Sequence, residues 1–193
     1  MPRNIILSIL LCTLSSCVIL NTPGFYSGYK KLSPAEKSQI IFASPEQNVC
    51  GLPNDKKLYS ITAAQLLNCL RSNDTSLVYF WSPNCHSEVC ISLPTAQHYC
   101  NRHNYKLYVV AQYYDFEKTN PQNTNPLPIF TANHKHYGTD YCNAYNNRFL
   151  KELRTDANLP KDDRYDRFYF FKSERLIFTK NSIVETKNAT IHR

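Results

Sequence analysis

Two cysteines, Cys85 and Cys90, follow an apolar run that ends in Phe80 and Trp81. The run has the length of a buried strand, and Pro83 lies in the turn expected after it. We therefore expect Cys85 at the point where a strand passes into a helix, where the positive end of the helix dipole stabilises a thiolate. The spacing predicts thiol–disulfide chemistry, with Cys85 as the attacking thiol and Cys90 as the resolving one.

Whether Cys85 and Cys90 can form a bridge depends on where the helix begins. On a continuous helix their Cα atoms would be roughly 8.6 Å apart, beyond the limit of about 7 Å for a disulfide. A bridge therefore needs Cys85 and His86 in the loop. Ser87 is a good N-cap residue and would place Cys90 at the third helical position. His86 favours the thiolate, whereas Glu88 opposes it.

The N-terminal residues resemble an export signal. Residues 1–16 combine a short charged start with about ten apolar residues, fewer than the roughly 20 that span a bilayer. Leu14-Ser-Ser-Cys17 resembles the bacterial lipobox, which implies cleavage after Ser16 and a diacylglycerol on Cys17. An ordinary signal peptide with a chance cysteine is the alternative. Val18, rather than Asp, follows Cys17 and favours the outer membrane, on its periplasmic face.

The chain has eight cysteines, of which one lies in the predicted signal and Cys17 would carry lipid. An oxidising compartment permits disulfides among the remaining six, and the sequence alone does not choose the pairing. Cys50 is a candidate to connect an irregular N-terminal segment to Cys69. Cys100 and Cys142 are expected to be structural, either bridging two layers or lying as buried apolar thiols.

Helices and strands are expected to alternate along the chain and to position the two cysteines. The predicted elements are a short helix at 34–41, an edge strand at 58–61, a helix at 62–70, a central strand at 76–81, a helix at 87–103 kinked by Pro94, a strand at 105–114, a polar loop at 115–130, a helix at 138–154, and a hairpin of 167–171 with 175–178. In the helix at 138–154, Tyr141, Tyr145, Phe149 and Leu153 form one apolar stripe.

This order resembles the thioredoxin fold, and three features carry the resemblance. Cys85 follows Trp81 by four residues, Pro94 lies in the next helix, and a βαβ half precedes an α-ββ half. The chain looks most like bacterial exported thioredoxin-like lipoproteins. The resemblance implies an α/β fold, a three-layer sandwich whose central mixed sheet has helices on both faces. The implied divisions are a signal peptide at 1–16, a lipid-anchored tether at 17–57 and a thioredoxin-like domain at 58–193.

The sequence departs from the family at three points. Four residues, not two, separate Cys85 from Cys90. Tyr79 stands where such enzymes often bury a carboxylate. The proline that usually precedes the third strand is missing, and the nearest positions are Tyr165 and Asp166. The competing interpretation is therefore a non-enzymatic structural or interaction lipoprotein, in which the cysteines only stabilise a degenerate fold.

A copper site is a further alternative, because copper chaperones of this superfamily use two cysteines and a remote histidine, and thiolates suit Cu(I). The candidate ligands are Cys85, Cys90 and one of His98, His103, His134 and His136. We expect no metal and no other cofactor. The formal charge of +7 is scattered along the chain, and nucleic acid is not an expected partner. The expected partners are thiols or disulfides of exported proteins, and the membrane through the lipid anchor.

Overall fold

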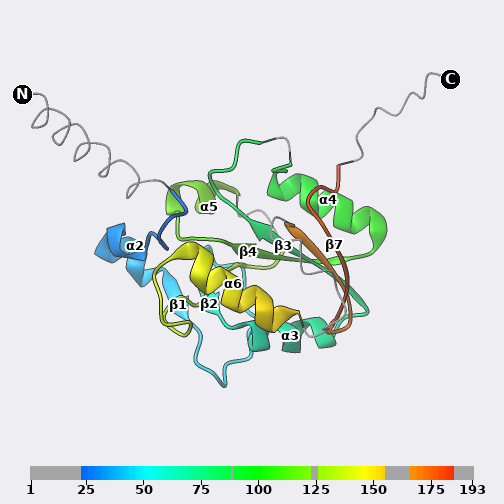
Figure 1. Cartoon of the computed structure of the whole chain (residues 1–193), viewed down its shortest axis with the longest axis horizontal. Helices are drawn as coiled ribbons and strands as arrows, with labels where there is room; N and C mark the ends of the chain where they lie inside the picture. The colour runs from blue at the N-terminus through cyan, green and yellow to red at the C-terminus, as the bar shows by residue number, and fades with distance from the viewer. Residues whose placement is uncertain (1–22, 88, 123–125, 155–165, 185–193) are drawn as a thin grey trace, which may run out of the picture.

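The structure is a computed structural model that describes residues 23–87, 89–122, 126–154 and 166–184 (Figure 1). The predicted signal, Cys17, Glu88 and Tyr165 lie outside these residues. The described residues form a seven-stranded mixed sheet with helices packed against it. The predicted α/β class with a central mixed sheet is therefore confirmed.

The sheet joins five parallel strands to two antiparallel ones. In their spatial order the strands are β1 (Ile40–Phe42), β2 (Leu58–Ile61), β5 (Ile129–Ala132), β4 (Lys106–Ala111), β3 (Thr75–Trp81), β6 (Phe168–Lys172) and β7 (Arg175–Lys180). Parallel pairing connects β1 to β2, β2 to β5, β5 to β4 and β4 to β3, and β6 is antiparallel to both β3 and β7.

Two apolar clusters cover the two faces of the sheet. The helices α3 (Ala63–Arg71) and α6 (Cys142–Leu153) contribute to one cluster, and α4 (Leu93–His103) and α5 (Phe116–Gln122) contribute to the other. Strand β3 supplies both, because successive side chains point to opposite faces: Val78 and Phe80 pack toward α6, and Tyr79 and Trp81 toward α4. A strand buried on both faces explains why its sequence is almost continuously apolar.

A local sequence signal sets the start of α3, whereas the N-cap residue of α6 makes no side-chain capping hydrogen bond. Thr62 caps α3 in a capping box with Gln65, as the capping threonine predicts. Helix α6 begins at Cys142, later than the predicted 138. Three members of its predicted stripe are buried, whereas Tyr141 is the N-cap residue and is 50% exposed. The stripe is therefore correct from Tyr145 onward.

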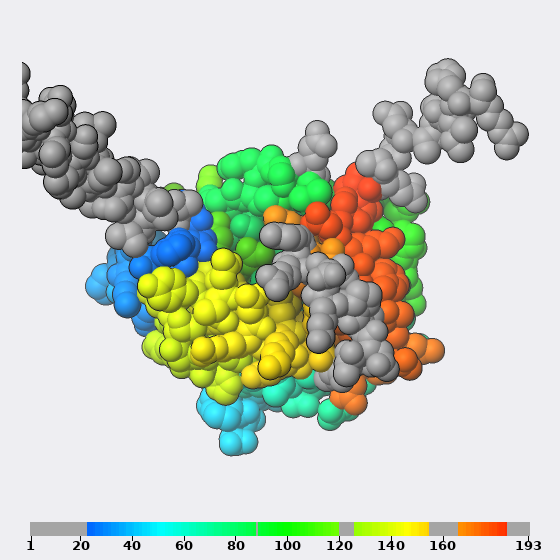
Figure 2. Space-filling model, in the orientation of Figure 1, coloured from blue at the N-terminus to red at the C-terminus, as the bar shows by residue number. Residues whose placement is uncertain are grey.

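The N-terminal segment packs against the start of α6. The backbone N–H of Cys142 donates to the carbonyl of Phe25 at 3.1 Å, and that of Ser27 donates to the carbonyl of Asp140 at 2.8 Å. The rings of Phe25, Tyr26 and Tyr141 lie within 4.9–5.6 Å of one another. In Figure 2 this blue segment lies against the yellow region that includes α6, and β7 in orange and red lies on the other side.

Residues 29–42 also belong to the folded body. They form a 3-10 turn, η1 (Tyr29–Lys31), the helix α2 (Pro34–Ser38) and strand β1. Ser33 and Glu36 make a capping box at α2, where the sequence predicts a short helix. Because β1 pairs with β2, the predicted edge position of residues 58–61 is wrong. The predicted loop at 115–130 is also wrong in part, since it contains α5 and the start of β5.

Candidate redox site in the β3–α4 loop

The loop between β3 and α4 holds both predicted active-site cysteines. The helix begins at Leu93, where the Ser92 side chain accepts a hydrogen bond from the N–H of Thr95. The predicted start near Ser87 is therefore wrong. Pro94 does not interrupt the helix either, because it lies in the first turn, where no intrahelical N–H partner is lost.

Cys85 and Cys90 form a disulfide whose Cα atoms are 5.9 Å apart. Both lie in the loop, partly exposed, so the helical spacing that would have kept them apart does not apply. The loop turns at each cysteine, because the N–H of Cys85 donates to Ser82 and that of Cys90 to Ser87. The Ser87 hydroxyl lies 3.3 Å from the sulfur of Cys85 and 3.2 Å from that of Cys90. A hydroxyl at these distances can donate to a thiolate at either position.

The late start of α4 changes the electrostatics of this pair. The helix dipole acts within about one turn of the helix end, and Cys85 is eight positions before Leu93. The prediction that Cys85 sits at a helix N-terminus is therefore wrong, and Cys90 is the closer of the two to the α4 N-terminus. The described neighbour that touches both sulfur atoms is the Ser87 hydroxyl.

Three side-chain hydrogen bonds fix the two ends of the loop. The Tyr113 hydroxyl accepts from the N–H of Asn84 at 3.0 Å, and the Asn84 side chain donates to Asp115 at 2.6 Å. The Tyr79 hydroxyl donates to the carbonyl of Ile91 at 3.0 Å. Burial raises the pKa of Tyr79 to about 12, so this phenol stays neutral and remains a donor. Tyr79 therefore holds the loop in place.

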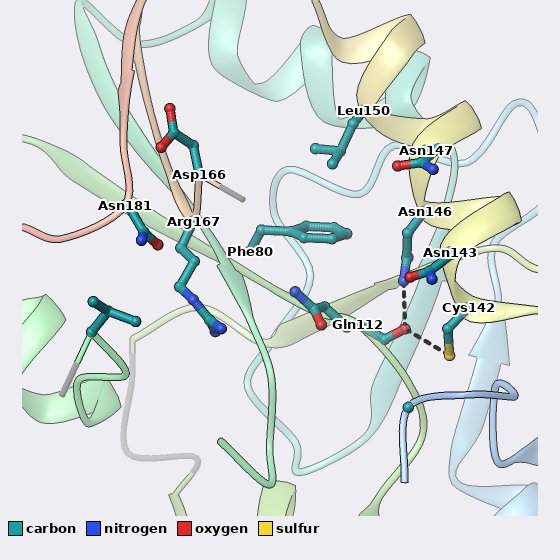
Figure 3. Close-up of a pocket in the computed structure, with 12 residues that line it drawn as sticks. Phe80, Gln112, Cys142, Asn143, Asn146, Asn147, Leu150, Asp166, Arg167 and Asn181 are labelled. Carbon is teal, nitrogen blue, oxygen red and sulfur yellow. Dashed lines mark hydrogen bonds between the residues drawn. The ribbon is translucent and has the colours of Figure 1, made fainter. Parts of the chain in front are cut away.

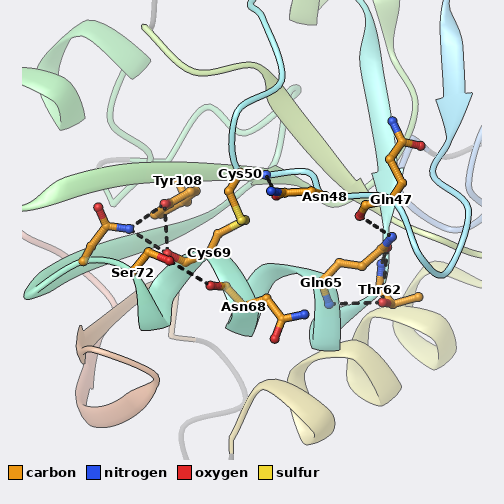
Figure 4. The surroundings of a disulfide bond; sticks show 10 residues. Gln47, Asn48, Cys50, Thr62, Gln65, Asn68, Cys69, Ser72 and Tyr108 are labelled. Atoms are coloured by element: carbon orange, nitrogen blue, oxygen red, sulfur yellow. Dashed lines mark hydrogen bonds between the residues drawn. A yellow bond between two sulfur atoms is a disulfide. The ribbon is translucent and has the colours of Figure 1, made fainter.

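The second disulfide joins Cys50 to Cys69, with Cα atoms 5.0 Å apart, as the sequence suggested (Figure 4). Cys69 is fully buried on α3. Gln65, one turn earlier on the same helix, donates to the carbonyls of Ser44 and Gln47. Helix α3 thus holds the connecting segment before β2 at two points. The two disulfides differ in access, because the Cys50–Cys69 bridge ends in the core and the Cys85–Cys90 bridge lies in a surface loop.

The two free thiols among the described residues, Cys100 and Cys142, are buried. They therefore do not bridge two layers and lie as buried thiols, and the sulfur of Cys142 also contacts the Tyr145 hydroxyl at 3.2 Å. Burial raises the pKa of the Cys100 thiol to about 12 and that of Cys142 to about 11. Neither is a nucleophile near neutral pH, because the thiolate is the reactive form.

These raised pKa values predict a loss of stability in alkali. An unfolded thiol ionises near pH 8.5, so the unfolded state loses its protons first and becomes favoured as the pH rises from about 9 toward 11 or 12. We expect the urea midpoint to fall over this range, and to fall less steeply when Cys100 and Cys142 are both alanine. Identical slopes for the two proteins would contradict the assignment.

The histidines proposed as copper ligands are dispersed. His98 and His103 are exposed on α4, and His136 is exposed after β5. His134 is buried, where its Nδ1 lies 3.1 Å from the Tyr114 hydroxyl, and burial lowers its pKa. Across the ranges that the structure covers, no three His, Cys, Asp or Glu side chains are grouped so that they could hold a metal ion.

A polar pocket of about 430 Å³ adjoins the loop (Figure 3). Its floor is formed by Phe80 and Gln112, at the carboxyl ends of β3 and β4, and its walls by α6 and by the residues around β6. The lining residues are Gly24, Phe80, Val89, Gln112, Cys142, Asn143, Asn146, Asn147, Leu150, Asp166, Arg167 and Asn181. Sequence reasoning did not find this site, because its residues come from segments far apart in the chain and form no motif.

No described helix combines the length and apolar character needed to cross a membrane. Comparison of the chain with protein-family models, with curated proteins and with solved structures found no match in any of the three.

Proposed function

We propose that this chain is a lipid-anchored, thioredoxin-like protein of the bacterial cell envelope that exchanges thiols and disulfides with exported proteins through Cys85 and Cys90. The observation that carries the proposal is the pairing of these two cysteines in a partly exposed loop after a buried parallel strand. The β3–α4–β4 crossover and the antiparallel pair β6–β7 support the thioredoxin-like assignment.

Exchange at this site needs no metal or organic cofactor. In the reduced protein, the Cys85 thiolate attacks one sulfur of a substrate disulfide and forms a mixed disulfide, and the other substrate sulfur leaves as a thiolate. The Cys90 thiolate then attacks the Cys85 sulfur and releases the second substrate thiolate. The substrate gains two electrons, and Cys85–Cys90 is left oxidised. The reverse sequence oxidises a substrate dithiol.

Ser87 supports both steps, because its hydroxyl lies within 3.3 Å of either sulfur. A neutral donor there stabilises whichever cysteine is the thiolate. Cys90 is the closer of the two cysteines in sequence to the start of α4 at Leu93. An ionised Cys90 is the nucleophile that resolves the mixed disulfide.

The location is part of the proposal. Cleavage after residue 16 and acylation of Cys17 would place the described domain at the periplasmic face of the outer membrane. Disulfides persist in that compartment. Two such bridges among the described residues are compatible with it. Mass spectrometry of the purified protein should find a diacylglycerol on an N-terminal Cys17, and an intact residue 1 would contradict the assignment.

Insulin reduction with dithiothreitol as the electron donor tests the activity. We expect the full-length protein to accelerate precipitation of the insulin B chain, and Cys85→Ser to reduce the rate to that of dithiothreitol alone, because exchange requires the attacking thiolate. Cys90→Ser should trap a mixed disulfide on Cys85 that is visible by non-reducing electrophoresis. Cys50→Ser serves as the matched control, because it breaks the other bridge and should retain turnover.

The insulin assay can also contradict the proposed exchange function. If the unmodified protein produces no acceleration, and Cys90→Ser traps no partner, the exchange function is lost. A change in thermal stability of Cys85→Ser without any activity in the unmodified protein would instead favour the structural lipoprotein.

A further inference from the structure

The polar pocket beside the β3–α4 loop contains an acceptor that has no partner among the described residues. Asn146 is 6% exposed, and its side-chain nitrogen donates to the carbonyl of Gln112 at 2.9 Å (Figure 3). Its carbonyl oxygen, Oδ1, is also buried and has no hydrogen-bond partner among the described residues. A buried amide oxygen is normally paired, so this atom is available to a donor that enters the pocket.

The opposite wall of the pocket presents a buried donor that also has no partner among the described residues. Nη1 of Arg167 is buried and has no hydrogen-bond partner within the described part of the chain. Figure 3 shows Arg167 and Asn146 on opposite sides, with Phe80 and Gln112 between them. Backbone pairing fixes the position of Arg167, because the N–H of Phe80 donates to its carbonyl at 2.7 Å.

A group that satisfies both atoms must accept from Arg167 and donate to Asn146. A carboxylate or phosphate accepts only and leaves Asn146 unpaired. The lining also gives an anion little net attraction, because Asp166 stands next to Arg167 and the other polar lining residues described are neutral amides and Cys142. A peptide group carries one C=O and one N–H and matches the pair.

The pocket lies beside the disulfide loop. Val89 lines the pocket and immediately precedes Cys90 in the chain. Phe80 on the floor belongs to the strand that leads into the loop, five residues before Cys85. A polypeptide held in the pocket therefore lies next to the segment that carries the reactive sulfurs.

We infer that the polar pocket binds the main chain of a polypeptide substrate, with Arg167 donating to a peptide carbonyl and Asn146 accepting from a peptide N–H. The role of this peptide as substrate rests on the proposed exchange function, whereas its binding does not. Because these contacts are made to main-chain atoms, the site accepts peptides of many different sequences. Its Phe80 floor gives an apolar surface against which the flanking side chains can lie.

Binding is tested without redox chemistry in the full-length Cys85→Ser/Cys90→Ser protein. The probe is acetyl-Ala-Ala-Ser-Ala-Ala-amide, titrated by NMR. We expect the side-chain signals of Asn146 and Arg167 to shift. The same peptide with every backbone nitrogen methylated should bind at least about tenfold more weakly, because it lacks the N–H groups that Asn146 accepts. Equal binding of the two peptides, or shifts confined to other surfaces, would overturn the inference.

Substitutions provide a second measurement. Asn146→Leu and Arg167→Met should each weaken binding of the unmethylated peptide by at least about tenfold. Asn101→Leu and Arg102→Met are matched controls on the exposed side of α4 and should leave it unchanged. If Asn146→Leu does not fold, because the bond to Gln112 is lost, Arg167→Met and the methylated peptide still decide the result.

The failure of this inference is distinguishable from failure of the exchange function. Hydroxyethyl disulfide is too small to need the pocket, and the acceleration of its reduction by glutathione when the unmodified protein is added reports on exchange at Cys85 and Cys90. Reduction of hydroxyethyl disulfide without peptide binding would remove the pocket proposal and keep the exchange function. Peptide binding without reduction of any disulfide would keep the pocket and remove the exchange function.

Discussion

Phe149→Ala is expected to lower the free energy of unfolding by about 3–5 kcal/mol, the range for removing a fully buried aromatic ring. Phe149 has no exposed surface and lies at the centre of the α6 stripe. Its ring stacks with Phe80 of β3, with centroids 6.3 Å apart, and meets Tyr137 edge to face at 6.2 Å. The cavity left by alanine would open between α6 and the sheet, where these rings limit relaxation.

Tyr141→Ala is the matched control on the same predicted stripe. Tyr141 is 50% exposed at the N-cap and contacts the rings of Phe25 and Tyr26. Aromatic pairs of this kind contribute about 0.5–1.5 kcal/mol, so we expect a loss in that range by urea unfolding. A loss for Tyr141→Ala as large as that for Phe149→Ala would mean that α6 does not begin where the structure places it.

Removal of the Cys50–Cys69 bridge is expected to cost about 3 kcal/mol. Its cysteines are 19 residues apart, and the chain-entropy relation gives about 3 kcal/mol for a loop of that size. The double variant Cys50→Ala/Cys69→Ala should therefore unfold at a lower urea concentration than the unmodified protein. We expect the loss of structure to occur in the connecting segment before β2. Without the disulfide, α3 would hold this segment only through the hydrogen bonds of Gln65.

The second bridge serves as the control for this measurement. Cys85 and Cys90 are 5 residues apart, for which the same relation gives about 2 kcal/mol. Cys85→Ala/Cys90→Ala should thus be the more stable of the two double variants. The reverse order would show that the loop disulfide contributes more to the fold than its exposed position suggests.

The sequence predicted best the elements whose signals are local and redundant. The apolar run before Trp81 predicts β3, because a strand buried on both faces needs nearly every residue apolar. Thr62 and Gln65 predict the start of α3 through a capping box. The hairpin of β6 and β7 follows from an aromatic-rich run and a second apolar run around a short turn, where Ser173 adopts a positive φ of 49°.

The elements that were missed depend on distant partners. Strand β5 is only four residues long and follows a proline-containing segment, and its strand character comes from pairing with both β2 and β4. Strand β1 is similarly short and is defined by its pairing with β2. No residue near either strand indicates its partner. The sequence therefore predicts a polar loop over β5 and extends the short helix to residue 41, whereas α2 ends at Ser38 and β1 begins at Ile40.

The predicted start of α4 is wrong because two serines, Ser87 and Ser92, are both suitable N-cap residues. Ser87 and Ser92 are both acceptable N-cap residues, but Pro94 is favoured in the first turn and disfavoured further inside a helix. Weighing that preference would have selected Ser92. The pocket residues Asn146 and Arg167 could not be found in this way, because neither has an unusual sequence neighbourhood and their relation exists only in the folded chain.

If Cys17 carries a lipid, the attachment of Phe25 to α6 limits the distance between the domain and the bilayer. If the lipid is on Cys17, six residue steps separate it from Pro23, where the described chain begins, and a fully extended chain covers at most about 20 Å over that span. The domain would therefore stay close to the bilayer surface, because the connecting segment is short. Its proposed substrates would then be exported proteins located at the membrane surface.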